Sequence, residues 1–136
     1  MFLYYLKTKE ESEDFLELAS MVSQLDGEID KDEDLDLYSY KFELNIPNYK
    51  IKHLPYKKCV EIIKNSTVQA KRSVIIELSA ILHSDKEIDG KENTWIMGLS
   101  NSIGLEEEET KRLMSWSKDF ADFIEIGLMY INHKNE

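Results

Sequence analysis

An internal repeat constrains this chain more than any other feature. Residues 26–33 read Asp-Gly-Glu-Ile-Asp-Lys-Asp-Glu and residues 85–92 read Asp-Lys-Glu-Ile-Asp-Gly-Lys-Glu, so five of eight positions are identical at a spacing of 59 residues. Each copy follows an apolar stretch. Each also precedes a residue that tolerates a left-handed backbone, Asn45 or Gly104, and then a hydrophobic residue. The repeat predicts two similar halves, about 10–46 and 69–105, each built as helix, acidic loop, helix and left-handed stop.

The hydrophobic pattern predicts helices almost throughout. Apolar residues recur three and four positions apart, the spacing of one helix face. Such sets are Phe15, Leu18, Ala19, Val22 and Leu25, then Val74, Leu78, Ile81 and Leu82, and finally Phe120, Phe123, Ile124, Leu128 and Ile131. We expect one all-α domain over residues 1–136, a compact bundle of six to seven helices with a pseudo-two-fold repeat and C-terminal helices over 106–132. Gly127, inside the last set, predicts the close approach of a neighbouring helix.

Residues 35–44 are the exception, because their apolar residues nearly alternate as in a strand. Their counterpart in the repeat, residues 92–103, has helical spacing, which favours a helix here too. Pro47 and Pro55 mark a linker, and Pro55 suits the start of a helix that runs to about Asn65. Residues 66–69, Ser-Thr-Val-Gln, predict a capping box that opens the next helix. The pattern leaves Met1–Leu6 undecided between helix, strand and disorder.

The repeated motif resembles the TerB-like domain of bacterial tellurite-resistance proteins. The pattern Asp-Gly-x-Ile-x-x-x-Glu is complete over residues 26–33, and the second copy matches at Asp85, Ile88 and Glu92 but has Lys86 in place of glycine. The resemblance covers roughly residues 10–132. It implies an all-helical fold with an internal pseudo-two-fold, a cation-attracting acidic surface and a role in metal-oxyanion and general stress responses.

The repeated acids have a purely structural interpretation. Asp30 and Asp89 suit the N-cap position of a helix, and Glu33 and Glu92, three residues later, complete a capping box. Acidic residues in a first turn also interact favourably with the positive end of the helix dipole.

A metal site is the alternative interpretation, because capping does not explain Asp26 and Asp85. Both follow an apolar helix, where the dipole disfavours a carboxylate unless an Asx turn forms. If the two loops meet, the site comprises Asp26, Glu33, Asp85 and Glu92, together with Asp30 and Asp89. Oxygen ligands of this kind suit Ca²⁺, Mg²⁺ or Mn²⁺. An EF-hand is disfavoured in both copies, since Leu37 and Ile96 stand where its closing glutamate belongs.

Charge and cysteine content exclude several functions. The net charge of −10 opposes nucleic-acid binding, although residues 41–72 carry +6 and residues 10–36 carry −11. No apolar run approaches the roughly 20 residues of a membrane span. Cys59, the only cysteine, excludes an internal disulfide and favours a reducing, cytoplasmic setting. It lies among lysines that would make it reactive, or on an apolar helix face that would make it a core residue.

These observations predict a non-enzymatic stress-response module with a divalent-cation site. The alternative is an acidic interaction protein, of an immunity or inhibitor type, that binds no metal. In both cases we expect a protein partner or a homo-oligomer, no nucleic acid, no integral membrane segment and no catalytic residues.

Overall fold

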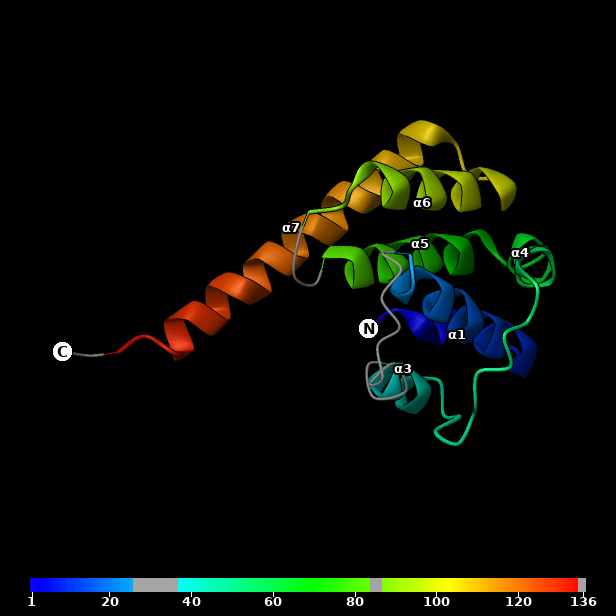
Figure 1. Ribbon diagram of the computed structural model, residues 1–136, viewed down its shortest axis with the longest axis horizontal. Coiled ribbons are helices and arrows are strands. Elements are labelled where there is room, and N and C mark those ends of the chain that lie inside the picture. The colour runs from blue at the N-terminus through cyan, green and yellow to red at the C-terminus, as the bar shows by residue number, and fades with distance from the viewer. Residues whose placement is uncertain (26–36, 84–86, 135–136) are drawn as a thin grey trace.

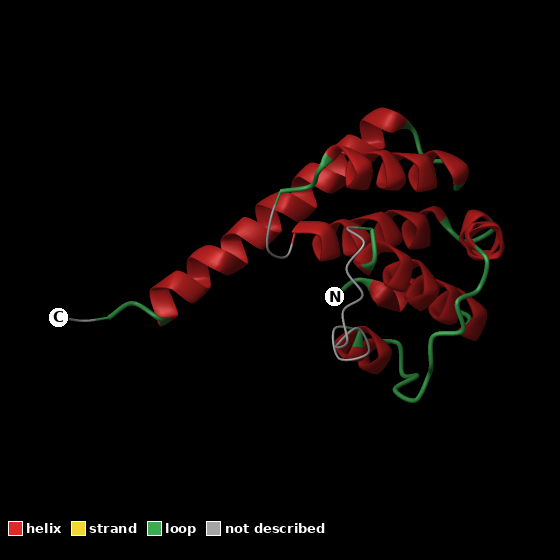
Figure 2. Cartoon of the chain, in the orientation of Figure 1, coloured by secondary structure: helices red, strands yellow, loops and turns green. Residues whose placement is uncertain are grey.

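Every secondary-structure element in the described part of the chain is helical (Figure 2). The computed structural model describes residues 1–25, 37–83 and 87–134. The elements are the 3₁₀ turn η1 (Leu3–Tyr5) and the α-helices α1 (Lys9–Ser23), α3 (Tyr38–Glu43), α4 (Tyr56–Lys64), α5 (Val68–His83), α6 (Gly90–Ser102) and α7 (Glu107–Ile131). The all-α prediction is confirmed, and residues 38–43 form a helix, as the repeat indicated. The pseudo-two-fold stays a prediction.

Helix α5 lies at the centre of the bundle (Figure 1). It packs against α1, α4, α6, α7 and η1. The predicted apolar faces of α1 and α5 form much of the core, and Leu3 and Leu6 from the N-terminal segment join it. The fully or almost fully buried core residues of α1 and α5 are Phe15, Leu16, Leu18, Ala19, Val22, Ala70, Val74, Ile75, Leu78 and Leu82.

Two helix starts differ slightly from their predictions. Thr67, not Ser66, caps α5: its Oγ1 accepts a hydrogen bond from the Ala70 N–H at 3.1 Å. The predicted Ser66–Gln69 capping box is therefore wrong. Ser66 lies just beyond the end of α4, and its Oγ donates back to the Ile62 carbonyl at 3.0 Å. Pro55 is the N-cap of α4 rather than its first helical residue.

The two predicted stops are confirmed and have the same hydrogen bonding. Asn45 has φ of 61° after α3, and Gly104 has φ of 93° after α6. The Ile46 N–H donates to the Lys41 carbonyl at 2.9 Å, and the Leu105 N–H donates to the Ser100 carbonyl at 3.0 Å. These are the six-to-one bonds of a Schellman motif, which satisfies carbonyls at the end of a helix.

Backbone conformation, rather than space, makes glycine necessary at position 104. A Cβ there would meet Lys71 Nζ at 3.8 Å, an ordinary contact. We expect Gly104→Ala to lower the free energy of unfolding by about 1–2 kcal/mol, the usual cost of a left-handed alanine. Gly98→Ala is the matched control, because Gly98 lies inside α6 with nothing near its Cβ position. Alanine at this position should raise the free energy of unfolding by roughly 0.5–1 kcal/mol. Urea unfolding measures both changes in stability. Equal changes for the two variants would contradict the claim that the left-handed backbone at position 104 requires glycine.

Helix α7 packs along only part of its length. Its first half lies against α5, where Ser117 Oγ donates to the Ile76 carbonyl at 3.1 Å. Its second half extends away from the bundle toward the C-terminus (Figure 1). Phe123, Ile124, Leu128 and Ile131 are 51–79% exposed, so this predicted apolar helix face does not belong to the core. The expected helix beside Gly127 is also absent, since no described atom lies within 4 Å of its Cβ position.

Candidate functional site

The described part of the acidic repeat acts as a helix cap. Asp89 is the N-cap of α6, and its Oδ1 accepts from the Glu92 N–H at 2.8 Å. Glu92 Oε1 accepts from the Asp89 N–H at 3.0 Å. This reciprocal pair is the predicted capping box, and it accounts for both acids without a ligand. Glu92 is only 3% exposed, so its carboxylate is turned into the protein.

The proposed cation site rests largely on other residues. Asp26, Asp30, Glu33 and Asp85 lie outside the described residues. Within residues 1–25, 37–83 and 87–134, no group of three or more His, Cys, Asp or Glu side chains is arranged to hold a metal ion. The metal site therefore stays a prediction, with two of its six residues already occupied in capping.

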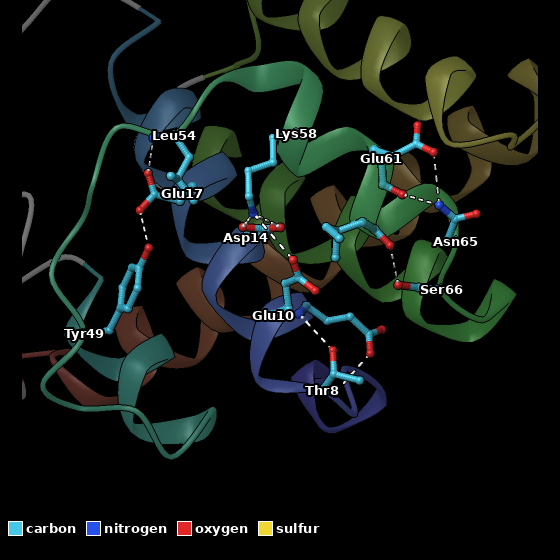
Figure 3. A network of polar contacts seen from close by, with 12 residues as sticks. Thr8, Glu10, Asp14, Glu17, Tyr49, Leu54, Lys58, Glu61, Asn65 and Ser66 are labelled. Atoms are coloured by element: carbon cyan, nitrogen blue, oxygen red, sulfur yellow. Dashed lines mark hydrogen bonds and ion pairs between the residues drawn. The ribbon is translucent and has the colours of Figure 1, made fainter.

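A buried carboxylate cluster is the strongest polar feature that the sequence pattern did not indicate. Glu17, in the middle of α1, is 1% exposed. It accepts three hydrogen bonds from the linker before α4: from Tyr49 OH at 2.5 Å, from the Lys52 N–H at 2.8 Å and from the Leu54 N–H at 2.9 Å. Figure 3 shows the bonds from Tyr49 and Leu54. One side chain thus holds the linker against α1.

The linker backbone is shaped to receive this carboxylate. His53, between the two N–H donors, has φ of 55°, a left-handed conformation that is uncommon outside glycine. Alternate N–H groups around such a residue form a concave anion site. Burial by itself raises the pKa of Glu17, but the hydrogen bonds from Lys52, Tyr49 and Leu54 outweigh burial and lower the pKa below its ordinary value. The group is an ionised structural anchor, closed to substrate by its own partners.

Asp14 and Cys59 lie beside this anchor and are also buried. Asp14 is 1% exposed and pairs with Lys58 Nζ at 3.2 Å (Figure 3). Burial raises the pKa of Asp14, and the Lys58 ammonium opposes that rise. Cys59 is fully buried, and burial, with Asp14 and Glu17 nearby, raises its pKa to about 12. A thiol with that pKa is a poor nucleophile, so the core interpretation of Cys59 is confirmed.

The most unusual surface of the described chain is the second half of α7. Between positions 123 and 131 seven large apolar side chains are 47–79% exposed: Phe123, Ile124, Ile126, Leu128, Met129, Tyr130 and Ile131. Scattered exposed hydrophobics are normal, whereas a contiguous group of this size marks a binding surface. The periodicity of the sequence correctly predicted an apolar face on this helix, but it did not show that the face is exposed.

Most apolar residues of this segment share one side of the helix, whereas Ile126 and Met129 lie on the side that carries the charged residues. At 100° per residue, Phe120, Phe123, Ile124, Gly127, Leu128, Tyr130 and Ile131 share one face. The charged residues Lys118, Asp122 and Glu125 lie on the other side, where Lys118 Nζ bonds Asp122 at 2.8 Å, and Asp119 lies at the edge between the two sides. We call the first set the α7 apolar face.

No helix among the described residues has the length and hydrophobicity needed to cross a membrane. Comparison of this chain with protein-family models, with curated proteins and with solved structures finds no match.

Proposed function

We propose that this protein is a non-enzymatic interaction domain that binds another protein chain through the α7 apolar face. The observation that carries the proposal is the exposure of that face on a helix that extends beyond its own bundle (Figure 1). A short helix gains most of its stability from packing an apolar face. A helix that leaves the bundle with such a face uncovered is therefore best explained by a partner that packs on it.

Charge favours a protein over a lipid surface as the partner. Interfacial membrane helices carry lysine and arginine on their polar side. The polar side of this segment carries Asp119, Asp122 and Glu125 against the single Lys118, and the whole chain has a net charge of −10. Anionic lipid would repel it. A reducing cytoplasmic setting fits the proposal, because Cys59 is a free, buried thiol.

A photo-crosslinking experiment tests the proposal. Benzoylphenylalanine replaces Phe123 on the α7 apolar face, or Phe42 on α3 as the control, in cells that make the full chain. Both phenylalanines are exposed, at 73% and 56%. The proposal predicts a discrete protein adduct from position 123 and none from position 42. Irradiation that gives no adduct at position 123, or equal adducts at both, would overturn it.

A divalent-cation site is the second candidate function. It is supported by the recurrence of the acidic motif and by the matching helix stops that follow each copy. Asp26 and Asp85 distinguish it from capping alone, since neither is needed as an N-cap. The candidate predicts that millimolar Ca²⁺, Mg²⁺ or Mn²⁺ raises the melting temperature and gives heat in calorimetry, and that joint Asp26→Asn and Asp85→Asn replacement removes both. No heat and no shift with any of the three ions would reject it.

A further inference from the structure

We propose that the partner on the α7 apolar face is a second copy of this chain, with the two α7 helices packed antiparallel and crossing near Gly127. This inference rests on the proposed function, because it specifies the occupant of the same surface. It requires that the face be large enough, self-complementary and open to close approach. The described residues support each requirement.

The exposed area is close to what a stable interface needs. Phe123, Ile124, Leu128, Tyr130 and Ile131 are 51–79% exposed. At about 150–250 Å² for a large aromatic side chain, Phe123 and Tyr130 alone leave roughly 230–380 Å² exposed, and the three aliphatic side chains add to this area on the same face. Stable interfaces bury about 600 Å² or more per partner, so this face and the partly exposed Phe120 supply a large part of one.

The order of residues on the face is symmetric about its midpoint, which suits a two-fold axis. A two-fold dimer uses the same patch on both subunits, so each residue must fit the one it meets. An antiparallel pair centred between residues 125 and 126 places Phe123 opposite Leu128 of the partner subunit and Phe120 opposite Ile131 of the partner subunit. In both pairs an aromatic ring meets an aliphatic side chain.

Gly127 supplies the close approach at the crossing point. In the same register Ile124 lies opposite Gly127 of the partner subunit, so a branched side chain meets a position without one. Nothing in the described chain lies within 4 Å of the Gly127 Cβ position, and glycine there lowers helix propensity without any benefit to the isolated chain. The acids Asp122 and Glu125 lie on the opposite side, and Asp119 lies at the edge of the face next to Tyr130, so none of the three stands between the paired apolar faces.

The mass of the full chain in solution tests the inference. Sedimentation equilibrium from low micromolar to several hundred micromolar protein should show a rise from 16.0 kDa toward twice that value. Ile124→Glu should weaken the dimer at least tenfold. Ile126→Glu is the matched control, because Ile126 is similarly exposed, at 47% against 51%, but lies away from the apolar face. Circular dichroism checks that both variants fold.

Cysteine pairing tests the antiparallel register. An equimolar mixture of the Ile124→Cys and Gly127→Cys variants should form more disulfide-linked dimer on oxidation than either variant alone. Cys59 is fully buried, so the introduced thiols are the accessible ones. Faster cross-linking of each variant with itself would overturn the antiparallel arrangement.

The outcomes separate this inference from the proposed function. A 16.0 kDa mass at every concentration, together with a cellular adduct of another protein at position 123, overturns the second copy and leaves the interaction domain standing. A monomer that sediments with phosphatidylcholine vesicles overturns both, as does a monomer that gives no adduct.

Discussion

Replacing Glu17 with alanine is expected to lower the free energy of unfolding by about 2–4 kcal/mol, because it leaves three part-buried donors without their acceptor, and an unsatisfied donor costs roughly 1–3 kcal/mol when it is fully buried. The donors are Tyr49 OH and the N–H groups of Lys52 and Leu54. The loss should also release the linker before α4, so hydrogen exchange at Lys52 and Leu54 should increase more than exchange in α6. Denaturant unfolding and hydrogen exchange measure the two effects.

Glu13→Ala is the control for Glu17→Ala. Glu13 is on the same helix, is partly exposed, and should change stability by less than about 0.5 kcal/mol on replacement. Equal losses for the two variants would show that helix propensity or charge, and not the buried hydrogen bonds, determines the effect.

The same cluster predicts a pH dependence with a definite sign. The pKa of Glu17 is lowered in the folded protein, mainly because the hydrogen bonds from Lys52, Tyr49 and Leu54 overcome the effect of burial. A carboxyl with a depressed folded pKa contributes stability above its unfolded pKa, and this contribution is lost as pH falls toward the folded pKa. Stability should therefore fall below about pH 4.5, the ordinary glutamate value, and fall less steeply in Glu17→Gln. If stability falls with pH as steeply in Glu17→Gln as in the unmodified protein, Glu17 is not the source of this pH dependence.

Phe15→Ala is expected to lower the free energy of unfolding by about 3–5 kcal/mol, the usual cost of removing a buried aromatic ring. Phe15 is fully buried in α1, and its ring lies 5.6 Å from that of Tyr40 in an edge-to-face arrangement. It therefore joins α3 to the rest of the core. Thermal or urea unfolding of the variant gives the size of the loss.

Phe42→Ala serves as the matched control for Phe15→Ala. Phe42 belongs to α3, the helix that Phe15 contacts through Tyr40, but is 56% exposed. Its replacement should change stability by no more than about 0.5 kcal/mol. A loss at Phe42 as large as that at Phe15 would mean that α3 is held by its outer face.

Local signals in the sequence predicted much of the fold. The spacing of Phe15, Leu18 and Val22 correctly placed a core face on α1, since such spacing is a direct consequence of helix geometry. Asn45 and Gly104 correctly marked left-handed stops, because few residue types accept that conformation. The Asp89 and Glu92 capping box was likewise local and was confirmed.

Features that depend on tertiary contacts were not predictable in this way. Glu17 sits between Leu16 and Leu18, and no local pattern shows that the linker wraps around its carboxylate. The stripe from Phe120 to Ile131 has the spacing of a core face, and periodicity does not show whether a neighbour within the chain or outside it covers that face. Ser66 and Thr67 are both good caps, and the choice between them depends on where α4 ends.

Hydrogen exchange of the full chain at two protein concentrations tests most directly the claim that two copies of the chain pair through the second half of α7. The amides of residues 119–131 should be protected at high concentration and lose protection on dilution. The amides of residues 110–118, which belong to the half of α7 that packs on the bundle, should be protected at both. Equal exchange of residues 119–131 at the two concentrations would contradict self-association through this helix.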